Sequence, residues 1–312
     1  MFVIFGATGK VGKATITKLS AEGAPVRAVL RDPGKAAPFA ALGCEIAIAE
    51  IGDADAMAGA MRNATAVQLI CPINPHAADA RRQMLRSIER MADAIDAARP
   101  PRVLAISDYG AHLTIDTGIT SLFRAMEERF RQCATEMVFL RSAEHMENWA
   151  RYLKIAGETG IMPSMHQPLS RPFPTVSAAD IGGMAADLLL AGEEHGHSPR
   201  IVHGEGPREY TALEIAAALG RLMTRSVVAR ELPRADWPAT LTRAGLSHNY
   251  ADLIVRLADV HNRGLIGVEA GVGEIRRGRT DLSAAFELFL PNAPRAEVVD
   301  HVRRGEESNQ GW

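Results

Sequence analysis

Short apolar runs alternate with amphipathic segments through the first half of the chain. The apolar runs occupy residues 2–5, 25–30, 45–49, 66–71, 103–107 and 137–140. Between them, apolar residues recur every three or four positions in segments 11–19, 36–42, 53–62, 76–98 and 121–133. Continuous apolar runs are typical of strands buried on both faces of a parallel sheet, and the longer period is typical of helices. The alternation predicts an α/β fold with a doubly wound parallel sheet.

Three glycines follow the first apolar run, in Gly6-Ala7-Thr8-Gly9-Lys10-Val11-Gly12. Gly6 permits a tight turn, Gly9 lets a pyrophosphate approach, and Gly12 lets the helix pack closely on the strand. The free N–H groups of the helix start then face the phosphates. Glycines at this spacing between a strand and a helix predict a dinucleotide site. Its expected residues are Gly6, Thr8, Gly9, Lys10, Val11 and Gly12.

The second half of the chain has a different pattern. Four prolines interrupt residues 163–174, and capping sequences at Ser177 and Thr211 predict helices reaching about residue 190 and spanning 212–223. Apolar runs predict short strands at 201–203 and 227–232. We therefore predict a Rossmann dinucleotide-binding domain over residues 1–152, to which 175–204 return. Residues 153–174 and 205–312 are predicted to form a smaller α/β substrate cap.

The residues after the second predicted strand bear on the choice of cofactor. Arg31 follows Leu30 directly, and Lys35 lies a few residues further on. An acidic residue at this point would bind a free ribose 2′-hydroxyl, whereas an arginine accommodates a 2′-phosphate. The sequence therefore favours NADP(H), with Arg31 and Lys35 as phosphate ligands. Asp32 leaves NAD(H) as the alternative, in which Arg31 is an ordinary solvated side chain.

Composition and charge narrow the class of protein. Of the 312 residues, 47% are hydrophobic and 23% are charged, as in globular proteins. A net charge of −2 offers no attraction to nucleic acid or to an anionic membrane, and no run is long enough to span a bilayer. The first strand begins at Phe2, which leaves no room for a signal peptide, so a cytoplasmic location is expected. Cys44, Cys71 and Cys133 form no C-x-x-C pair, and no metal site is predicted.

The chain resembles the NmrA-like branch of the atypical short-chain dehydrogenases/reductases over nearly its whole length. The resemblance is carried by residues 6–12, by Arg31-Asp32-Pro33, and by residues 141–148, which are similar to the family segment Arg-Pro-Gly-Phe-Phe-Met-Glu-Asn. Glu127 matches a family glutamate on the preceding helix. The resemblance implies further cofactor contacts near the adenine, the ribose, the pyrophosphate and the nicotinamide. The residues concerned are Glu50, Ile51, Cys71, Pro72, Ile73, Ser107 and Glu144.

The usual catalytic pair of the family is missing. Typical relatives protonate a carbonyl from a tyrosine that is followed four residues later by a lysine. None of the four tyrosines has that lysine, and Phe123 stands where relatives carry it. The remaining candidates are Tyr109 or His112 as proton donor and Ser107 as the group that orients a carbonyl. The alternative is that Ser107 and Tyr109 only line the cleft and that His112 is a solvated loop residue.

Two functions are compatible with these features. The first is an NADPH-dependent oxidoreductase that transfers hydride to a quinone or another conjugated acceptor, because that chemistry proceeds without a strong tyrosine acid. The second is a non-catalytic NADP(H)-binding redox sensor that acts through a regulatory protein partner, which the missing pair favours. A small-molecule substrate is expected in the first case, and a homodimer is open in both. The polar residues Glu144 and His145, where relatives often have aromatics, indicate either substrate contact or a structural hydrogen bond.

Overall fold

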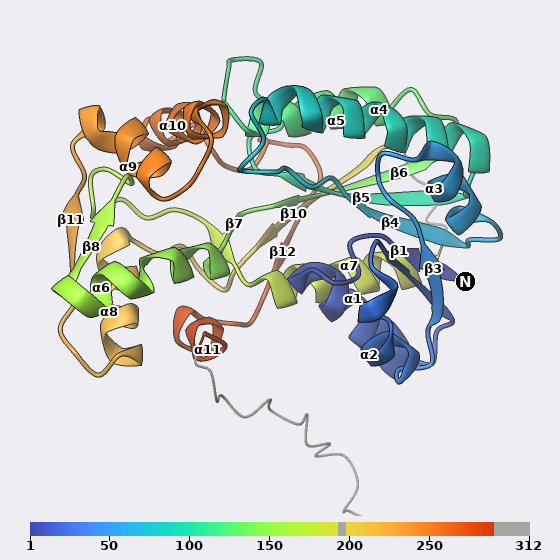
Figure 1. The fold of residues 1–312 in the computed structure, drawn as a ribbon, viewed down its shortest axis with the longest axis horizontal. Helices are drawn as coiled ribbons and strands as arrows, with labels where there is room; N and C mark the ends of the chain where they lie inside the picture. Colours follow the sequence, from blue (N-terminus) through green and yellow to red (C-terminus); the bar gives the residue numbers. More distant parts are fainter. Residues whose placement is uncertain (193–197, 290–312) are drawn as a thin grey trace, which may run out of the picture.

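An eight-stranded parallel sheet forms the centre of the computed structural model, which describes residues 1–192 and 198–289 (Figure 1). The strand order is β12-β10-β6-β5-β4-β1-β2-β3, and every neighbouring pair is parallel. The predicted doubly wound sheet is therefore confirmed. The strands are β1 (Phe2–Ile4), β2 (Val26–Leu30), β3 (Glu45–Ile48), β4 (Ala66–Ile70), β5 (Arg102–Asp108), β6 (Glu136–Ser142), β10 (Arg200–Glu205) and β12 (Glu274–Arg277).

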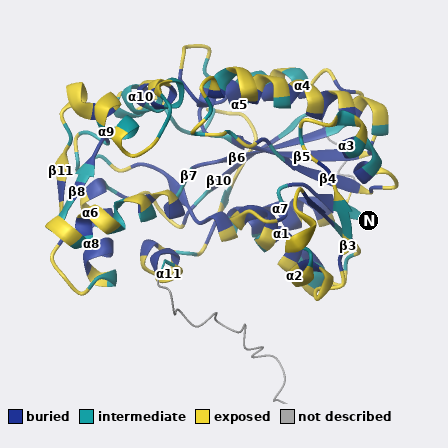
Figure 2. Cartoon of the chain, in the orientation of Figure 1, coloured by how far each residue is buried: buried dark blue, intermediate teal, exposed yellow. Residues whose placement is uncertain are grey.

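Helices cover both faces of this sheet (Figure 1). One layer holds α3 (Ala54–Met61), α4 (Ala80–Ala98) and α5 (Thr120–Phe130), and the other holds α1 (Lys10–Ala21), α2 (Ala37–Ala40) and α7 (Ala178–Leu190). A separate hydrophobic cluster fills the space on each side of the sheet. The central strands are buried on both faces, as Figure 2 shows. This burial explains why they appear in the sequence as continuous apolar runs.

Side-chain caps fix several helix starts. The carboxylate of Asp53 accepts a hydrogen bond from Ala56 N at 2.9 Å, and Thr211 with Glu214 forms a complete capping box at α8 (Ala212–Leu222). The long helix α4 begins at Ala80 and not at His76 as predicted, because Asp79 caps it by accepting from Arg82 N at 2.9 Å. Polar groups at helix starts satisfy N–H groups that have no partner within the helix.

A smaller part adjoins one end of the sheet. It contains α6 (Leu153–Thr159), β8 (Ile161–Ser164), α8, β11 (Val228–Glu231), α9 (Trp237–Arg243), α10 (His248–Asn262) and α11 (Leu282–Glu287), with a 3₁₀ helix over Met146–Tyr152. Strand β8 pairs in parallel with β11, and β7 (Glu144–His145) pairs with β9 (Thr175–Val176). Its own core surrounds the buried Trp149. No helix in the described ranges is long and apolar enough to cross a membrane.

Strand β12 departs from the predicted division of the chain. It lies in the range assigned to the cap, yet it pairs with β10 and extends the central sheet. The edge of β10 offers unpaired backbone groups, and β12 satisfies them. Gly273 has a φ of +74°, and a Cβ there would lie 2.3 Å from the carbonyl oxygen of Ile201. Glycine thus allows the close approach. Residues 290–312 of the predicted cap lie outside the described residues.

Candidate active site

The glycine turn has the geometry of a phosphate cradle. Gly6 has a φ of +72°, and Gly9 N donates to Gly6 O at 2.9 Å. A Cβ on Gly12 would lie only 2.3 Å from the carbonyl oxygen of Gly6, so only glycine permits this packing of α1 on β1. Helix α1 begins at Lys10 without a side-chain cap. The first N–H groups of the helix are therefore left for an anion.

The residues expected around the adenosine lie at the carboxyl ends of β2 and β3. Arg31, Lys35 and Glu50 are exposed there, and Ile51 is half-buried. The carboxylate of Asp32 accepts a hydrogen bond from Gly34 N at 2.9 Å and caps the 3₁₀ helix Pro33–Lys35. This bond engages Asp32 within its own loop. The exposed cations of the loop fit a ribose 2′-phosphate better than a free 2′-hydroxyl.

A cavity of about 350 Å³ opens where β4, β5 and β6 end and the smaller part begins. Pockets of this size suit small organic ligands. The sheet side of its wall includes Cys71, Ser107, Asp108, Tyr109, Ala143 and Glu144. The facing wall includes Arg151, Met165, His166, Tyr250 and His261. Because open α/β sheets bind ligands at the carboxyl ends of their strands, this cavity is the candidate active site.

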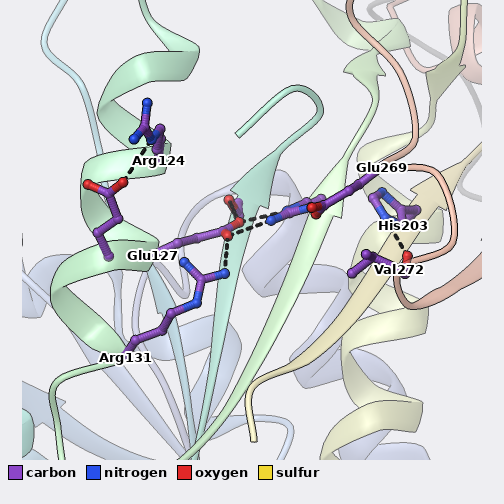
Figure 3. A network of polar contacts seen from close by, with 9 residues as sticks. Arg124, Glu127, Arg131, His203, Glu269 and Val272 are labelled. Carbon is purple, nitrogen blue, oxygen red and sulfur yellow. Dashed lines mark hydrogen bonds and ion pairs between the residues drawn. The ribbon is translucent and has the colours of Figure 1, made fainter. Parts of the chain in front are cut away.

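Ser107 is tied into a buried ionic network centred on Glu127. Figure 3 shows Glu127 with its neighbours Arg131 and Glu269. Its hydroxyl donates to Glu127 Oε1 at 2.6 Å, and Arg141 donates to both oxygens of Glu127 at 2.9 and 2.8 Å. Burial opposes ionisation of Glu127, but the hydrogen bonds and charge of Arg141 outweigh it and lower the pKa. Arg141 also reaches Glu269 at 2.5 Å. The two residues matched to the family, Glu127 and Arg141, thus lock α5 to β6 behind Ser107.

Tyr109 lines the cavity, but its hydroxyl donates to Glu205 Oε2 at 3.2 Å. Burial, followed by the negative charge of Glu205, raises the pKa of Tyr109 above its usual value. A phenol held in this way is a weak acid. His112 is half-buried and is not among the described residues that line the cavity, and burial lowers the pKa of its imidazole.

Asp108 is a cavity residue that sequence reasoning passed over. Its Oδ2 accepts a hydrogen bond from Thr120 Oγ1 at 2.6 Å. Burial raises the pKa of this carboxyl to about 7, against the opposing hydrogen bond from Thr120. The sequence could have indicated Asp108 as a site residue, because it lies between Ser107 and Tyr109 at the end of the same strand. Phe123 also lines the cavity, so an apolar ring occupies the place where relatives carry lysine.

Glu144 meets two histidines from the facing wall. Its Oε2 lies 3.2 Å from His166 Nε2, and its Oε1 lies 3.7 Å from an Arg151 nitrogen. Burial would raise the pKa of Glu144, but the hydrogen bond and charge of His166 lower it to about 2. The ring of His261 stands at 88° to that of His166, with the centroids 4.7 Å apart. Sequence reasoning gave Glu144 a cofactor contact and did not find His166 or His261.

His145 is one of the two polar residues for which the sequence left two roles open, substrate contact or a structural hydrogen bond. Its Nε2 lies 3.0 Å from Ser142 Oγ, and the Ser142 hydroxyl donates in turn to the carbonyl of Ala143 at 2.9 Å. This arrangement is a structural hydrogen bond at the end of β6, and His145 also lines the cavity, so substrate contact stays a prediction. Cys71 is buried, whereas Pro72 is exposed and Ile73 half-buried, on the segment that leaves β4.

Comparisons with known proteins agree with this geometry. Residues 6–148 match a family model described as NAD(P)H-binding. Quinone oxidoreductase 2 of Escherichia coli (strain K12) is 25% identical over 309 residues, which cover 97% of this chain and 98% of that protein. An NAD(P)H azoreductase of Xenophilus azovorans is 23% identical over 270 residues, which cover 82% and 86% of the two chains.

Solved structures share the whole architecture. The NADPH-dependent quinone oxidoreductase of Escherichia coli, complexed with NADPH, matches with a TM-score of 0.76 at 22% identity, covering 93% of this chain and 100% of that one. The Citrobacter sp. triphenylmethane reductase, complexed with NADP(H), matches with a TM-score of 0.76 at 19% identity and the same coverage. At these identities the likeness concerns the fold.

The parallel sheet and the glycine turn at its first strand define a Rossmann-type dinucleotide-binding protein. More particularly, residues 6–148 match the NAD(P)H-binding family model, and the similarity to quinone oxidoreductase 2 over almost the whole chain supports the predicted resemblance to NmrA-like NAD(P)-binding reductases.

Proposed function

We propose that this chain is an NADPH-dependent oxidoreductase that reduces quinones or other conjugated acceptors. The observation that carries the proposal is the composition of the cavity wall, in which Phe123 replaces a lysine and Tyr109 is bound to Glu205. A plain ketone needs a proton in the transition state, because its alkoxide is strongly basic. A reduced quinone is a stabilised phenolate-like anion, so an acid as strong as the Tyr–Lys pair is not required. The names of the quinone and azo-dye reductases support this class of acceptor.

The proposed cofactor site runs along the carboxyl edge of the sheet. Gly6, Gly9 and Gly12 shape the turn, and the N–H groups at the start of α1 bind the pyrophosphate. Arg31 and Lys35 bind the 2′-phosphate, and Glu50 with Ile51 borders the adenine. The other proposed contacts are Thr8, Lys10, Val11, Cys71, Pro72, Ile73, Ser107 and Glu144. NADPH, when bound there, supplies the hydride.

The residues of this chain then position the acceptor and supply its proton. Ser107 and Tyr109 form the wall beside the nicotinamide, with the Ser107 oxygen held by Glu127. Asp108 supplies the proton to the reduced acceptor, since it is the acidic group at the end of β5 whose carboxyl stays partly protonated near neutral pH. His112, the other expected donor, is not among the described residues that line the cavity.

A substrate panel tests the proposal. Purified protein is incubated with NADPH and, separately, a benzoquinone, an enone, an azo dye and an unactivated ketone, while NADPH absorbance is followed. We expect turnover of the conjugated acceptors and negligible turnover of the ketone. Efficient ketone reduction would overturn the proposal, and tight NADPH binding without any turnover would indicate the redox sensor. Sedimentation of the same sample tests whether the protein forms a homodimer, and the cytoplasmic location stays a prediction.

A further inference from the structure

Three side chains from distant parts of the chain converge on one wall of the cavity. Glu144 comes from β7, His166 from the segment after β8, and His261 from the last turn of α10. One ligand atom from each lies within 4.8 Å of the other two. Within residues 1–192 and 198–289 this is the only such group of three. Two imidazoles and a carboxylate that meet at the wall of a cavity are a candidate binding site.

The surrounding residues hold these side chains in place. The His166 ring stacks on Phe173, with centroids 4.1 Å apart and planes 9° apart. Arg151 approaches Oε1 of Glu144, which leaves Oε2 directed at His166. The partly buried ring of His261 stands edge-on to both His166 and Phe173, with centroids 4.7 and 5.4 Å away. These ring contacts hold the two histidines beside Glu144 on the cavity wall.

We propose that Glu144, His166 and His261 bind a divalent transition metal, with Zn²⁺ as the expected ion. Two histidines and one glutamate are a known donor set for zinc, and three protein ligands leave a fourth position open. Bonds of about 2.0–2.2 Å in tetrahedral geometry place neighbouring ligand atoms roughly 3.3–3.6 Å apart. The observed contact of 3.2 Å between Glu144 and His166 is close to this value, and the ligand atom of His261 lies within 4.8 Å of both.

All three side chains line the cavity, so an ion held by them would lie beside a bound acceptor. The metal site deepens the proposed function and rests on it. The C–H bond of the nicotinamide breaks, its electron pair passes to the acceptor as hydride, and NADPH is oxidised to NADP⁺. An ion held by Glu144, His166 and His261 would act as a Lewis acid that stabilises the charge developing on the acceptor oxygen, and a proton from Asp108 completes the reduction. The metal stays divalent throughout.

Metal binding is measured first, without any turnover. Chelator-treated protein is titrated with Zn²⁺ by calorimetry and then analysed for metal content, and Co²⁺ serves as an absorbing probe. We expect one Zn²⁺ per chain and a tetrahedral Co²⁺ spectrum. Glu144→Gln and His261→Gln should each weaken binding by more than the ~10–100-fold lost with an outer-shell partner. His145→Gln removes a histidine from the same cavity wall and should leave the affinity unchanged.

Thermal denaturation of each variant shows whether it is folded, so that a loss of binding can be assigned to the site. Absence of stoichiometric Zn²⁺ binding, or binding that survives both substitutions, would overturn the proposal. Turnover measurements distinguish a failure of the metal site from a failure of the proposed function. Equal quinone reduction by metal-free and Zn²⁺-loaded protein would remove the metal from the reaction and leave the reductase standing. Zn²⁺ binding at this site without reduction of any acceptor would uphold the site and refute the reductase.

Discussion

The hydroxyl of Tyr109 donates a hydrogen bond to Glu205 Oε2 across the strands β5 and β10, at 3.2 Å. The phenol thereby faces a carboxylate that disfavours its ionisation. Tyr109→Phe should therefore reduce the kcat for a quinone by less than about tenfold, well below the ~10²–10⁴-fold typical of a lost general acid. Steady-state kinetics of the two proteins measure this. A loss above a hundredfold, with normal folding, would restore tyrosine as the acid.

Cofactor preference should depend on Arg31. Its exposed guanidinium follows β2, and Asp32 is engaged by Gly34 in its own loop. NADPH should bind more tightly than NADH, and Arg31→Ala should remove about 1–3 kcal/mol of that preference, the value of a charge-assisted hydrogen bond. Titration of both cofactors gives the ratio. Equal affinities in the unmodified protein would contradict the assignment of the phosphate site.

Substitutions of Gly9 and Gly12 should have different effects, one on dinucleotide binding and the other on stability. Gly9 has an ordinary extended backbone, with φ −75° and ψ 166°, and a Cβ there would lie 3.2 Å from Gly6 O. Gly9→Val should therefore fold and lose dinucleotide binding, because its side chain occupies the place of the pyrophosphate.

Gly12→Val is the matched comparison. Its Cβ would lie 2.3 Å from the same backbone oxygen, so this variant should lose stability, by at least the ~1–3 kcal/mol typical of overpacking. Thermal melting and NADPH titration of both variants test the pair of predictions. Normal NADPH affinity in folded Gly9→Val would mean that the cofactor does not use this turn.

The pH dependence of kcat should follow the titration of the Asp108 carboxyl. Its raised pKa of about 7 means that the carboxyl is protonated below that pH and ionised above it. If the protonated form donates the proton, kcat for a quinone is full below pH 7 and falls as the pH rises through 7. Asp108→Asn should lower kcat and flatten this limb of the profile. A profile that keeps its fall near pH 7 in Asp108→Asn would assign the titration to another group.

The sequence predicted what depends on local pattern. Buried parallel strands have continuous apolar runs, and the turn at Gly6 requires glycine, so the sequence alone predicts both features. The meeting of Glu144 with His166 and His261 depends on how distant segments pack, and no local spacing encodes it. The edge strand β12 was missed for a similar reason, because its partner is β10 and its own sequence is mostly polar.

The pairing of β8 with β11 joins Ile161–Ser164 to Val228–Glu231, and between these segments the chain returns to the central sheet as β10. The smaller part is thus built from separate stretches of the sequence. A recombination event with a single crossover between the two stretches would unite a β8 and a β11 from different parents. A crossover between residues 148 and 161 instead transfers both strands together, and the NAD(P)H-binding residues 6–148 are then inherited as one block.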